Sequence, residues 1–343
     1  MSNNIVNPGL EFERPIYELE ARIEKLQGSA DDSPEAADEV RQAKRELTTL
    51  IKKIYSDLSS WQTVQVARHK DRPQTLDYVS LVFDEFVELN GDKFFGDDRA
   101  IRTGLAKLNQ FKVMFVGHHK GRDLDERSEC YFGCAHPEGY RKALAKMKMA
   151  AKFGIPIICL IDTPGAYPGI GAEERGQAQA IAENMYEMSR LKTPIICIVI
   201  GEGGSGGALG IGVGDRIAML ENSYYSVISP EGCAGIIWKS HKYAEKAAEA
   251  LKFTSKHLPK FGVVDDVIEE PLGGAHRDPH QMANRLKIYL LKTLRELQGL
   301  PTDDLLNKRY EKFRKMGVFL EQLEQQSTGE DETDQEPVDS AAG

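Results

Sequence analysis

The sequence predicts an α/β fold with a layered core, and two features lead to this prediction. The tetrapeptide Pro-Ile-Ile-Cys occurs at 156–159 and again at 194–197, and each copy leads through a glycine-rich turn to a helix candidate. Apolar, strand-like runs alternate with helix candidates from residue 75 onward. Repeated strand–turn–helix units are typical of layered α/β domains, and 343 residues are enough to bury a large core.

The first region of the chain has a different pattern. Apolar residues recur at helical spacing in two stretches between 13 and 58, separated by a linker rich in turn residues. We therefore expect an N-terminal helical hairpin over 1–60, which either docks a partner or has a purely structural role. Basic residues along its second helix are expected to form a solvated face.

The remaining elements are expected in the following order. Early elements are a helix over 76–89, strands over 100–108 and 112–117, a helix over 138–153 and a strand over 155–162. Later elements are strands over 216–220, 225–228 and 262–268 and helices over 281–297 and 302–325. The corresponding domains are a core over 61–298, a C-terminal helix over 299–326 and a disordered acidic tail over 327–343.

Composition narrows the class of protein. A hydrophobic fraction of 41% and a charged fraction of 28% are ordinary for a globular protein. No apolar run approaches the ~18 residues of a membrane span, and the N-terminus lacks the basic and apolar regions of a signal peptide. The net charge of -9 disfavours a nucleic-acid surface, and an odd number of cysteines, five, suits a reducing compartment. We expect a cytoplasmic protein with no membrane or nucleic-acid partner.

The glycine-rich run after the second Pro-Ile-Ile-Cys is the strongest candidate site, and three interpretations fit it. Gly201, Gly203 and Gly206 match a dinucleotide fingerprint, with Glu221 as the distal acid. Gly203-x-Ser205-x-Gly207 matches a nucleophile elbow. The third interpretation is an oxyanion hole of backbone N–H groups at a helix start. The pattern alone leaves all three open.

Each alternative carries its own requirement. A serine hydrolase would use Ser205 with downstream partners such as Asp265 and His276. A dinucleotide-dependent oxidoreductase would place Glu221 on a ribose. A non-catalytic scaffold would use the helical hairpin for docking. No second cysteine pair completes a zinc set with Cys130 and Cys134, so we expect no metal in this chain.

Two further turns repeat the strand-to-turn design. Asp162 ends a strand before two Pro-Gly pairs, and it can act as a base, a metal ligand or a helix cap. Ser229 precedes Pro230, a pattern typical of a helix N-cap with proline at the first helical position.

Six motifs share one resemblance. They are Thr75-Leu-Asp-Tyr78, Pro137-Glu-Gly-Tyr-Arg-Lys142, Asp162-Thr-Pro-Gly-Ala-Tyr-Pro-Gly169, Gly171-Ala-Glu-Glu-Arg-Gly176, Gly201-Glu-Gly-Gly-Ser-Gly-Gly-Ala208 and Tyr225-Ser-Val-Ile-Ser-Pro-Glu-Gly-Cys-Ala234. In this order they resemble the bacterial acetyl-CoA carboxylase carboxyltransferase alpha subunit, over about 10–310. One departure is the loop between 121 and 133, which is more acidic here and puts charge-based partner contacts of that loop in doubt. The acidic residues are Asp123, Asp125, Glu126 and Glu129.

The resemblance implies a crotonase-like ββα spiral core behind the N-terminal helical hairpin. It implies transfer of a carboxyl group from carboxybiotin, on the biotin carboxyl carrier protein, to acetyl-CoA, which gives malonyl-CoA for fatty acid biosynthesis. The implied partner is a beta subunit with a zinc ribbon, in an α2β2 heterotetramer that works with biotin carboxylase. The beta subunit would hold the CoA ester.

The resemblance also assigns site residues. Backbone N–H groups of Gly206 and Gly207 would form an oxyanion hole for the ureido oxygen of biotin. The walls of the biotin slot would come from the two neighbouring turns and the start of the glycine run. These residues are Gly165, Ala166, Gly204, Ser229 and Gly232.

Overall fold

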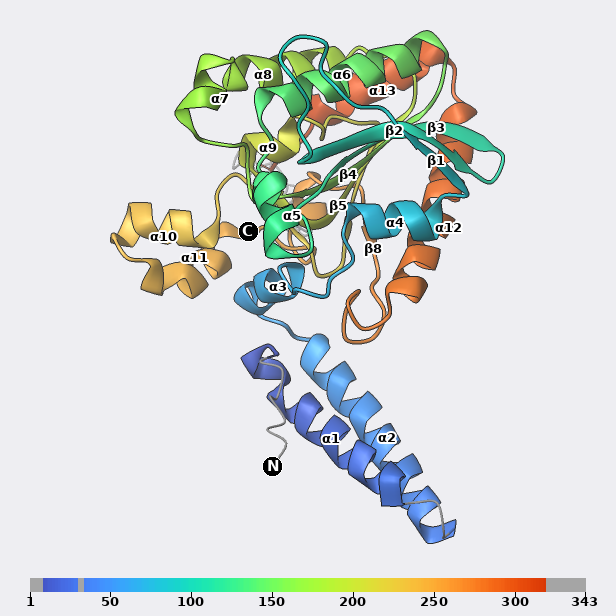
Figure 1. The fold of residues 1–343 in the computed structure, drawn as a ribbon, viewed down its shortest axis with the longest axis vertical. Helices are drawn as coiled ribbons and strands as arrows, with labels where there is room; N and C mark the ends of the chain where they lie inside the picture. The colour runs from blue at the N-terminus through green and yellow to red at the C-terminus, as the bar shows by residue number, and fades with distance from the viewer. Residues whose placement is uncertain (1–8, 30–33, 319–343) are drawn as a thin grey trace, which may run out of the picture.

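The computed structural model describes residues 9–29 and 34–318, and its centre is one mixed sheet (Figure 1). The strand order is β1-β2-β3-β4-β5-β6-β8, and β7 pairs with the end of β5. Strand β2 is antiparallel to both of its neighbours, β1 and β3, and the pairs from β3 onward are parallel. The strands are β1 (Glu85–Glu88), β2 (Ile101–Leu108), β3 (Phe111–His118), β4 (Ile157–Thr163), β5 (Ile195–Gly204), β6 (Arg216–Leu220), β7 (Tyr224–Ser226) and β8 (Asp266–Ile268).

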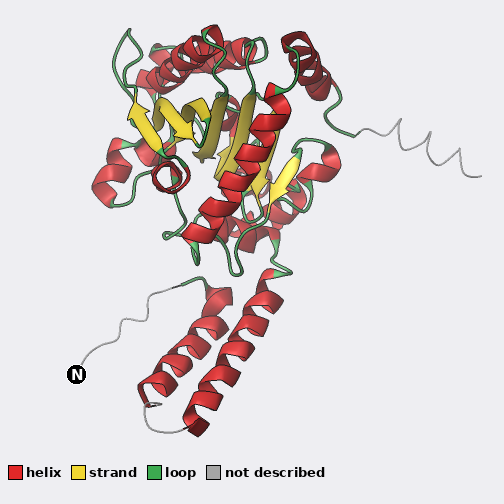
Figure 2. Cartoon of the chain, turned by 90° about the vertical axis from the view of Figure 1, so that its right-hand side faces the viewer, coloured by secondary structure: helices red, strands yellow, loops and turns green. Residues whose placement is uncertain are grey.

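Helices cover both faces of this sheet. Figure 2 shows a long helix, α12, lying across one face. The helices are α1 (Arg14–Ser29), α2 (Pro34–Tyr55), α3 (Ser60–Ala67), α4 (Thr75–Val82), α5 (Leu124–Glu129), α6 (Pro137–Lys152), α7 (Ile170–Glu174), α8 (Gln177–Met188), α9 (Ser205–Leu209), α10 (Pro230–Trp238), α11 (Ala244–Leu251), α12 (Pro279–Gln298) and α13 (Thr302–Arg314). Short 3-10 turns are η1 (Glu11–Glu13), η2 (Tyr131–Gly133), η3 (His241–Tyr243) and η4 (Leu258–Phe261).

The repeated tetrapeptide forms the two central strands. Ile157 pairs with Ile195, and Cys159 pairs with Cys197, so the two copies lie side by side in register. Because side chains alternate along a strand, Cys159 packs toward α6 and α8, whereas Ile158 packs toward α4 and α12. Both faces of β4 and β5 are therefore buried, which explains their nearly continuous apolar runs.

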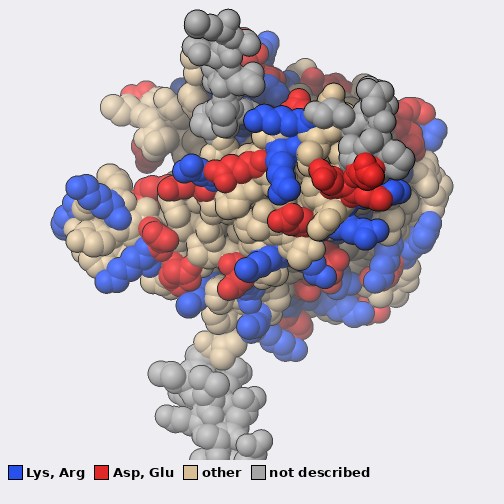
Figure 3. Space-filling model, turned by 90° about the horizontal axis from the view of Figure 1, so that it is seen from below, with Lys and Arg blue, Asp and Glu red and all other residues tan. Residues whose placement is uncertain are grey.

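The N-terminal hairpin extends away from the sheet. Helices α1 and α2 lie side by side below the core in Figures 1 and 2. They contact each other through Leu19, Ile23 and Ala43, and the basic residues of α2 are exposed, as expected for a solvated face. Figure 3, which looks at the molecule from the side of the hairpin, shows basic and acidic side chains interspersed over that side.

Three sequence-based boundaries differ from the structure by more than two residues. The helix expected over 76–89 ends at Val82, and the chain continues as edge strand β1, whose Phe86 packs on Phe115 of β3. The strand expected over 262–268 is only β8, because the chain leaves η4 through the left-handed Gly262 (φ 68°) and becomes a strand only at Asp266. Helix α13 ends at Arg314; residues 319–325 and the acidic tail over 327–343 lie outside the described residues.

No helix in the described part of the chain is both long and apolar enough to cross a membrane.

Candidate oxyanion site at the end of β5

The glycine run forms a sharp junction between β5 and α9. Strand β5 continues through Gly204, and α9 begins at Ser205, whose φ of 50° lies in the left-handed region. N–H groups in the first turn of a helix have no intrahelical acceptor and point toward whatever lies before the helix. Here they belong to the segment 205–207, which we call the glycine turn. Its geometry suits binding of a negatively charged oxygen.

The turn after β4 packs against the glycine turn backbone to backbone. A Cβ atom at position 207 would lie 2.5 Å from the carbonyl carbon of Gly165 and 2.6 Å from the amide nitrogen of Ala166. A Cβ atom at position 204 would lie 2.1 Å from the carbonyl oxygen of Pro164. Glycine at 204 and 207 therefore allows the two turns to touch. The structure brings four of the predicted site residues, Gly165, Ala166, Gly204 and Gly207, into direct contact.

A large apolar cavity opens beside the glycine turn. Its volume is about 1010 Å³, and Ser205 and Gly206 form part of its wall. The other walls come from α8, α9, the end of β7, η4 and α13. Apolar side chains dominate these walls, among them Leu209, Tyr225, Phe253, Leu258, Phe261 and Phe313. An apolar cavity with a few backbone donors on one wall is typical of a small-molecule site.

The remaining two predicted residues, Ser229 and Gly232, lie at the start of α10. The Ser229 hydroxyl accepts a hydrogen bond from the Gly232 amide at 3.0 Å, and Pro230 is the first helical residue. The sequence-based interpretation of Ser229 as an N-cap is therefore confirmed. Because this hydrogen bond uses the Gly232 amide and the Ser229 oxygen, their role in a biotin slot stays a prediction.

A buried ion-pair network under the two turns was missed by the sequence analysis. Lys120 Nζ lies 2.6 Å from Asp162 Oδ1 and 2.7 Å from Glu202 Oε1. Arg68 Nε lies 2.7 Å from Glu202 Oε2, and the Tyr224 hydroxyl donates to the same oxygen at 2.5 Å. The sequence signal for this network is the presence of charged residues next to or inside apolar strands, but the sequence analysis singled out only Asp162. Asp162 caps no helix, because it accepts from the Glu202 amide at 2.9 Å.

The network controls the charge of Glu202. Burial alone would raise the pKa of Glu202, but the charges of Lys120 and Arg68 outweigh burial and hold its pKa at about 2. Burial would likewise lower the pKa of Lys120, but Asp162 and Glu202 raise it. Glu202 and Lys120 therefore stay ionised and paired around neutral pH.

The residues required by the two alternative enzyme mechanisms lie elsewhere. Asp265 accepts from the Ile217 amide and pairs with Lys312, whereas His276 stacks on His69 at 4.0 Å between ring centroids. No Ser-His-Asp triad forms around Ser205 in the described residues. Glu221 accepts from the Glu270 amide at 3.0 Å. Gly201 and Gly203 lie inside strand β5, whereas a dinucleotide fingerprint needs its glycines in the strand-to-helix turn.

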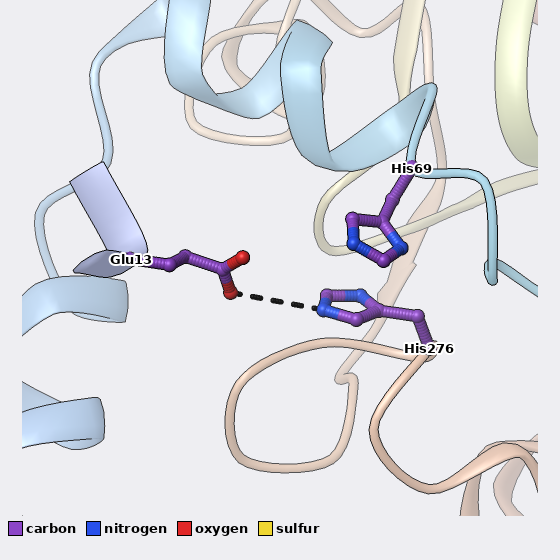
Figure 4. A group of neighbouring side chains, drawn as sticks. All are labelled: Glu13, His69 and His276. Atoms are coloured by element: carbon purple, nitrogen blue, oxygen red, sulfur yellow. Dashed lines mark ion pairs between the residues drawn. The ribbon is translucent and has the colours of Figure 1, made fainter. Parts of the chain in front are cut away.

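A second cluster of ionisable side chains joins the hairpin to the core. His69 and His276 face Glu13 of η1, and His276 Nε2 lies 3.7 Å from Glu13 Oε1 (Figure 4). Imidazole and carboxylate are metal-ligand types, and these three residues are close enough to share an ion. However, the hydroxyls of Tyr17 and Tyr55 already donate to the two Glu13 oxygens. We therefore treat this cluster as the attachment point of the hairpin.

The acidic segment after Gly121 has mainly local partners. Asp123 accepts from the Glu126 amide and caps α5, and Glu126 lies 2.8 Å from His119 Nε2. Glu129 pairs with Arg99. Asp123 and Glu126 therefore have partners in or next to their own loop, Glu129 has a partner before β2, and only Asp125 has no contact of this kind among the described residues.

Comparison with known proteins shows which protein family this chain matches. A family described as acetyl co-enzyme A carboxylase carboxyltransferase-like matches residues 9–317. The acetyl-coenzyme A carboxylase carboxyl transferase subunit alpha of Rhodopirellula baltica is 66% identical over 318 residues, which cover 93% of this chain and 100% of that protein. The protein with the same description from Methylococcus capsulatus is 54% identical and covers 91% of this chain and 98% of that protein.

Solved structures with low identity share the fold. The transcarboxylase 12S subunit is 22% identical to this chain, with a TM-score of 0.52. The match covers 66% of this chain and 43% of the transcarboxylase chain, which is less than half of that larger protein. A Pseudomonas malonate decarboxylase chain is 19% identical with a TM-score of 0.51, and the match covers 63% of this chain and 86% of that one. At these identities the likeness concerns the fold, which is crotonase-like, as expected.

Proposed function

Since the chain belongs to the family of acetyl-CoA carboxylase carboxyltransferase alpha subunits, we propose that its glycine turn binds the ureido oxygen of biotin. The activity of the family is the transfer of a carboxyl group from carboxybiotin to acetyl-CoA, which forms malonyl-CoA. The observation that carries the proposal is the contact between the glycine turn and the turn after β4, next to the apolar cavity.

The proposed chemistry uses main-chain groups. Release of CO2 from carboxybiotin leaves negative charge on the ureido oxygen, and the N–H groups of Gly206 and Gly207 would stabilise that charge. Loss of one such donor typically costs ~3 kcal/mol, or 10²–10³ in rate. Gly165, Ala166 and Gly204 would form the walls of the slot, and the apolar cavity offers a surface for the aliphatic parts of the substrate. No side-chain nucleophile is required, because the biotin enolate left after release of CO2 can itself take the methyl proton of acetyl-CoA, and the resulting carbanion attacks CO2.

The partner assignments belong to the same proposal. We propose an α2β2 heterotetramer in which the beta subunit binds acetyl-CoA or malonyl-CoA and carries the zinc ribbon. The biotin carboxyl carrier protein would deliver carboxybiotin made by biotin carboxylase. The surface we assign to the beta subunit is the outer side of α10 with the end of β7, because Val227, Ile236 and Ile237 are 80%, 64% and 60% exposed there. We also propose a cytoplasmic location, which suits five cysteines that form no disulfide.

The test is the reverse reaction, carboxylation of free biotin by malonyl-CoA, measured with this chain alone, the beta subunit alone and the mixture. Activity in the mixture only is the expected result, since the site is proposed to lie between the subunits. Activity of this chain alone would contradict the shared site. No activity from a stably formed complex would contradict the proposed role of the glycine turn, and fluorophosphonate labelling of Ser205 would then test the hydrolase alternative.

A further inference from the structure

We propose that Lys120 is a positioning residue, which fixes the spacing of the two turns of the oxyanion site by joining Asp162 of β4 to Glu202 of β5. The proposal rests on the proposed function of the glycine turn. Asp162 lies three residues before Gly165, and Glu202 lies three residues before Ser205, so each carboxylate controls the strand end that leads into one turn. Lys120 binds both carboxylates through one ammonium group.

The pairing of β4 and β5 is irregular where Lys120 acts. Ile161 pairs with Val199, but the next pair is Thr163 with Gly203, so β5 contains two additional residues at this point. The backbone groups that lose their strand partners bond to side chains instead. The Glu202 amide donates to Asp162 Oδ1 at 2.9 Å, and the Ile200 carbonyl accepts from Arg72 Nε at 2.9 Å. On the side of β5 that faces β4, side chains therefore replace the missing ladder bonds, while β7 pairs with the end of β5.

The most buried charges of this network balance. Lys120 pairs with Asp162 and Glu202, and Arg68 pairs with Glu202; both carboxylate side chains are only 8% exposed, whereas Glu231, the other partner of Arg68, is 33% exposed. Removing Lys120 would leave two buried carboxylates with the single cation Arg68, and uncompensated buried charge is strongly unfavourable. The two strand ends would then separate, unless one of the carboxylates takes up a proton. Separation would disturb the contact of Gly207 with Gly165, where the two backbones already touch.

Other ionisable groups face these residues, and none replaces the charge of Lys120. Arg72 is committed to Glu270 through two hydrogen bonds, and Arg68 also pairs with Glu231. His118 is fully buried, and burial, together with the smaller effect of the Lys120 charge, lowers its pKa to about 3, so it is neutral in wild type. Three other titratable side chains interact electrostatically with Lys120, Asp162 or Glu202, namely those of Tyr78, Cys134 and Tyr224.

The experiment compares Lys120→Met with the double variant Lys120→Met/Asp162→Asn in the assembled complex with the beta subunit. Asparagine keeps the oxygen that accepts from the Glu202 amide but removes one negative charge, so the double variant restores the balance. We expect Lys120→Met to lower kcat of biotin carboxylation roughly 10- to 100-fold, as for a displacement of about 1 Å, with little change in KM for malonyl-CoA. The double variant should recover most of this loss.

The pH profile separates positioning from a general loss of structure. In Lys120→Met one carboxylate of the network has no counter-charge, and a proton can neutralise it. The activity of this variant relative to wild type should therefore rise as pH falls. The double variant should show no such dependence. Lys148→Met, on the outer face of α6, is the matched control and should behave as wild type.

Several outcomes would overturn the proposal. They are unchanged kcat in assembled Lys120→Met, a loss that is independent of pH, and no recovery in the double variant. If Lys120→Met does not assemble with the beta subunit, the variant Asp162→Asn tests the proposal instead, because this substitution also unbalances the charges of the network. An unchanged kcat and an unchanged pH profile in Asp162→Asn would contradict the proposal. An inactive wild-type complex would instead contradict the proposed function.

Discussion

Gly207 and Ala166 come from different turns, yet a Cβ atom on Gly207 would lie 2.6 Å from the Ala166 amide nitrogen. The adjacent Gly206 differs. A Cβ atom there would meet only Ile181, at 3.8 Å, which is ordinary van der Waals contact. Gly207 therefore allows the close approach of two backbones, whereas Gly206 faces the cavity.

This difference predicts unequal effects of alanine at the two glycines. Gly207→Ala should lower carboxyltransferase kcat about 10²-fold or more, because the turn after β4 must move away. Gly206→Ala should have a smaller effect, since its N–H remains and its new methyl group fits. Rates measured on both assembled complexes, with thermal stability as a control, check this prediction. Equal losses would contradict the assigned geometry.

Ser205 should not be a nucleophile. We expect Ser205→Ala to keep most activity and wild-type protein to resist fluorophosphonate labelling, since no triad assembles around Ser205 in the described residues. Because Ser205 has a φ of 50°, Ser205→Gly should stabilise the chain by about 1 kcal/mol. Thermal denaturation and the biotin carboxylation assay measure the two effects. Complete inactivation of folded Ser205→Ala would support the hydrolase alternative.

The exposed isoleucines of α10 predict a partner surface. Ile237→Asp should weaken binding of the beta subunit by about 2 kcal/mol, roughly thirtyfold in Kd, without altering the fold of the isolated chain. Ile288→Asp on α12 is a matched control, because Ile288 is also 60% exposed but lies elsewhere. Calorimetric titration with the beta subunit provides the Kd values. Equal affinities of the two variants would place the interface away from α10.

The attachment of the hairpin should weaken in acid. Burial and the neighbouring His276 lower the pKa of His69 to about 4, whereas the pKa of a histidine in the unfolded chain is about 6.5. The unfolded state therefore binds more protons between these values, and the stability contributed by His69 is lost as pH falls from about 6.5 toward 4. Glu13, with a pKa of about 2, keeps its charge in this range; Lys70 and Asp71 also face His69.

Hydrogen exchange of α1 and α2 at pH about 7 and about 5 measures this effect. After correction for the slower intrinsic exchange of amides in acid, the protection of α1 should be smaller at the lower pH in wild type. His69→Gln, which cannot titrate, should reduce the difference, and an unchanged difference in that variant would show that another group is responsible.

Local patterns predicted much of the fold. The two Pro-Ile-Ile-Cys copies became neighbouring strands in register because each is apolar on both faces and therefore suits the centre of a parallel sheet. The prediction of a helix over 76–89 is wrong beyond Val82, because packing of Phe86 against Phe115 favours an edge strand in that segment. Helical spacing alone does not reveal such a long-range contact.

The sequence by itself determined the family, the glycine turn and the hairpin, since each depends on residues that are close together in the chain. Only the tertiary structure revealed why Gly207 must lack a side chain, because the atoms that exclude one belong to residues 165 and 166. It also revealed the link from Lys120 to Asp162 and Glu202, which are 42 and 82 residues further along the chain. A buried charge is stable only beside its counter-charge, and that neighbourhood forms when the chain folds.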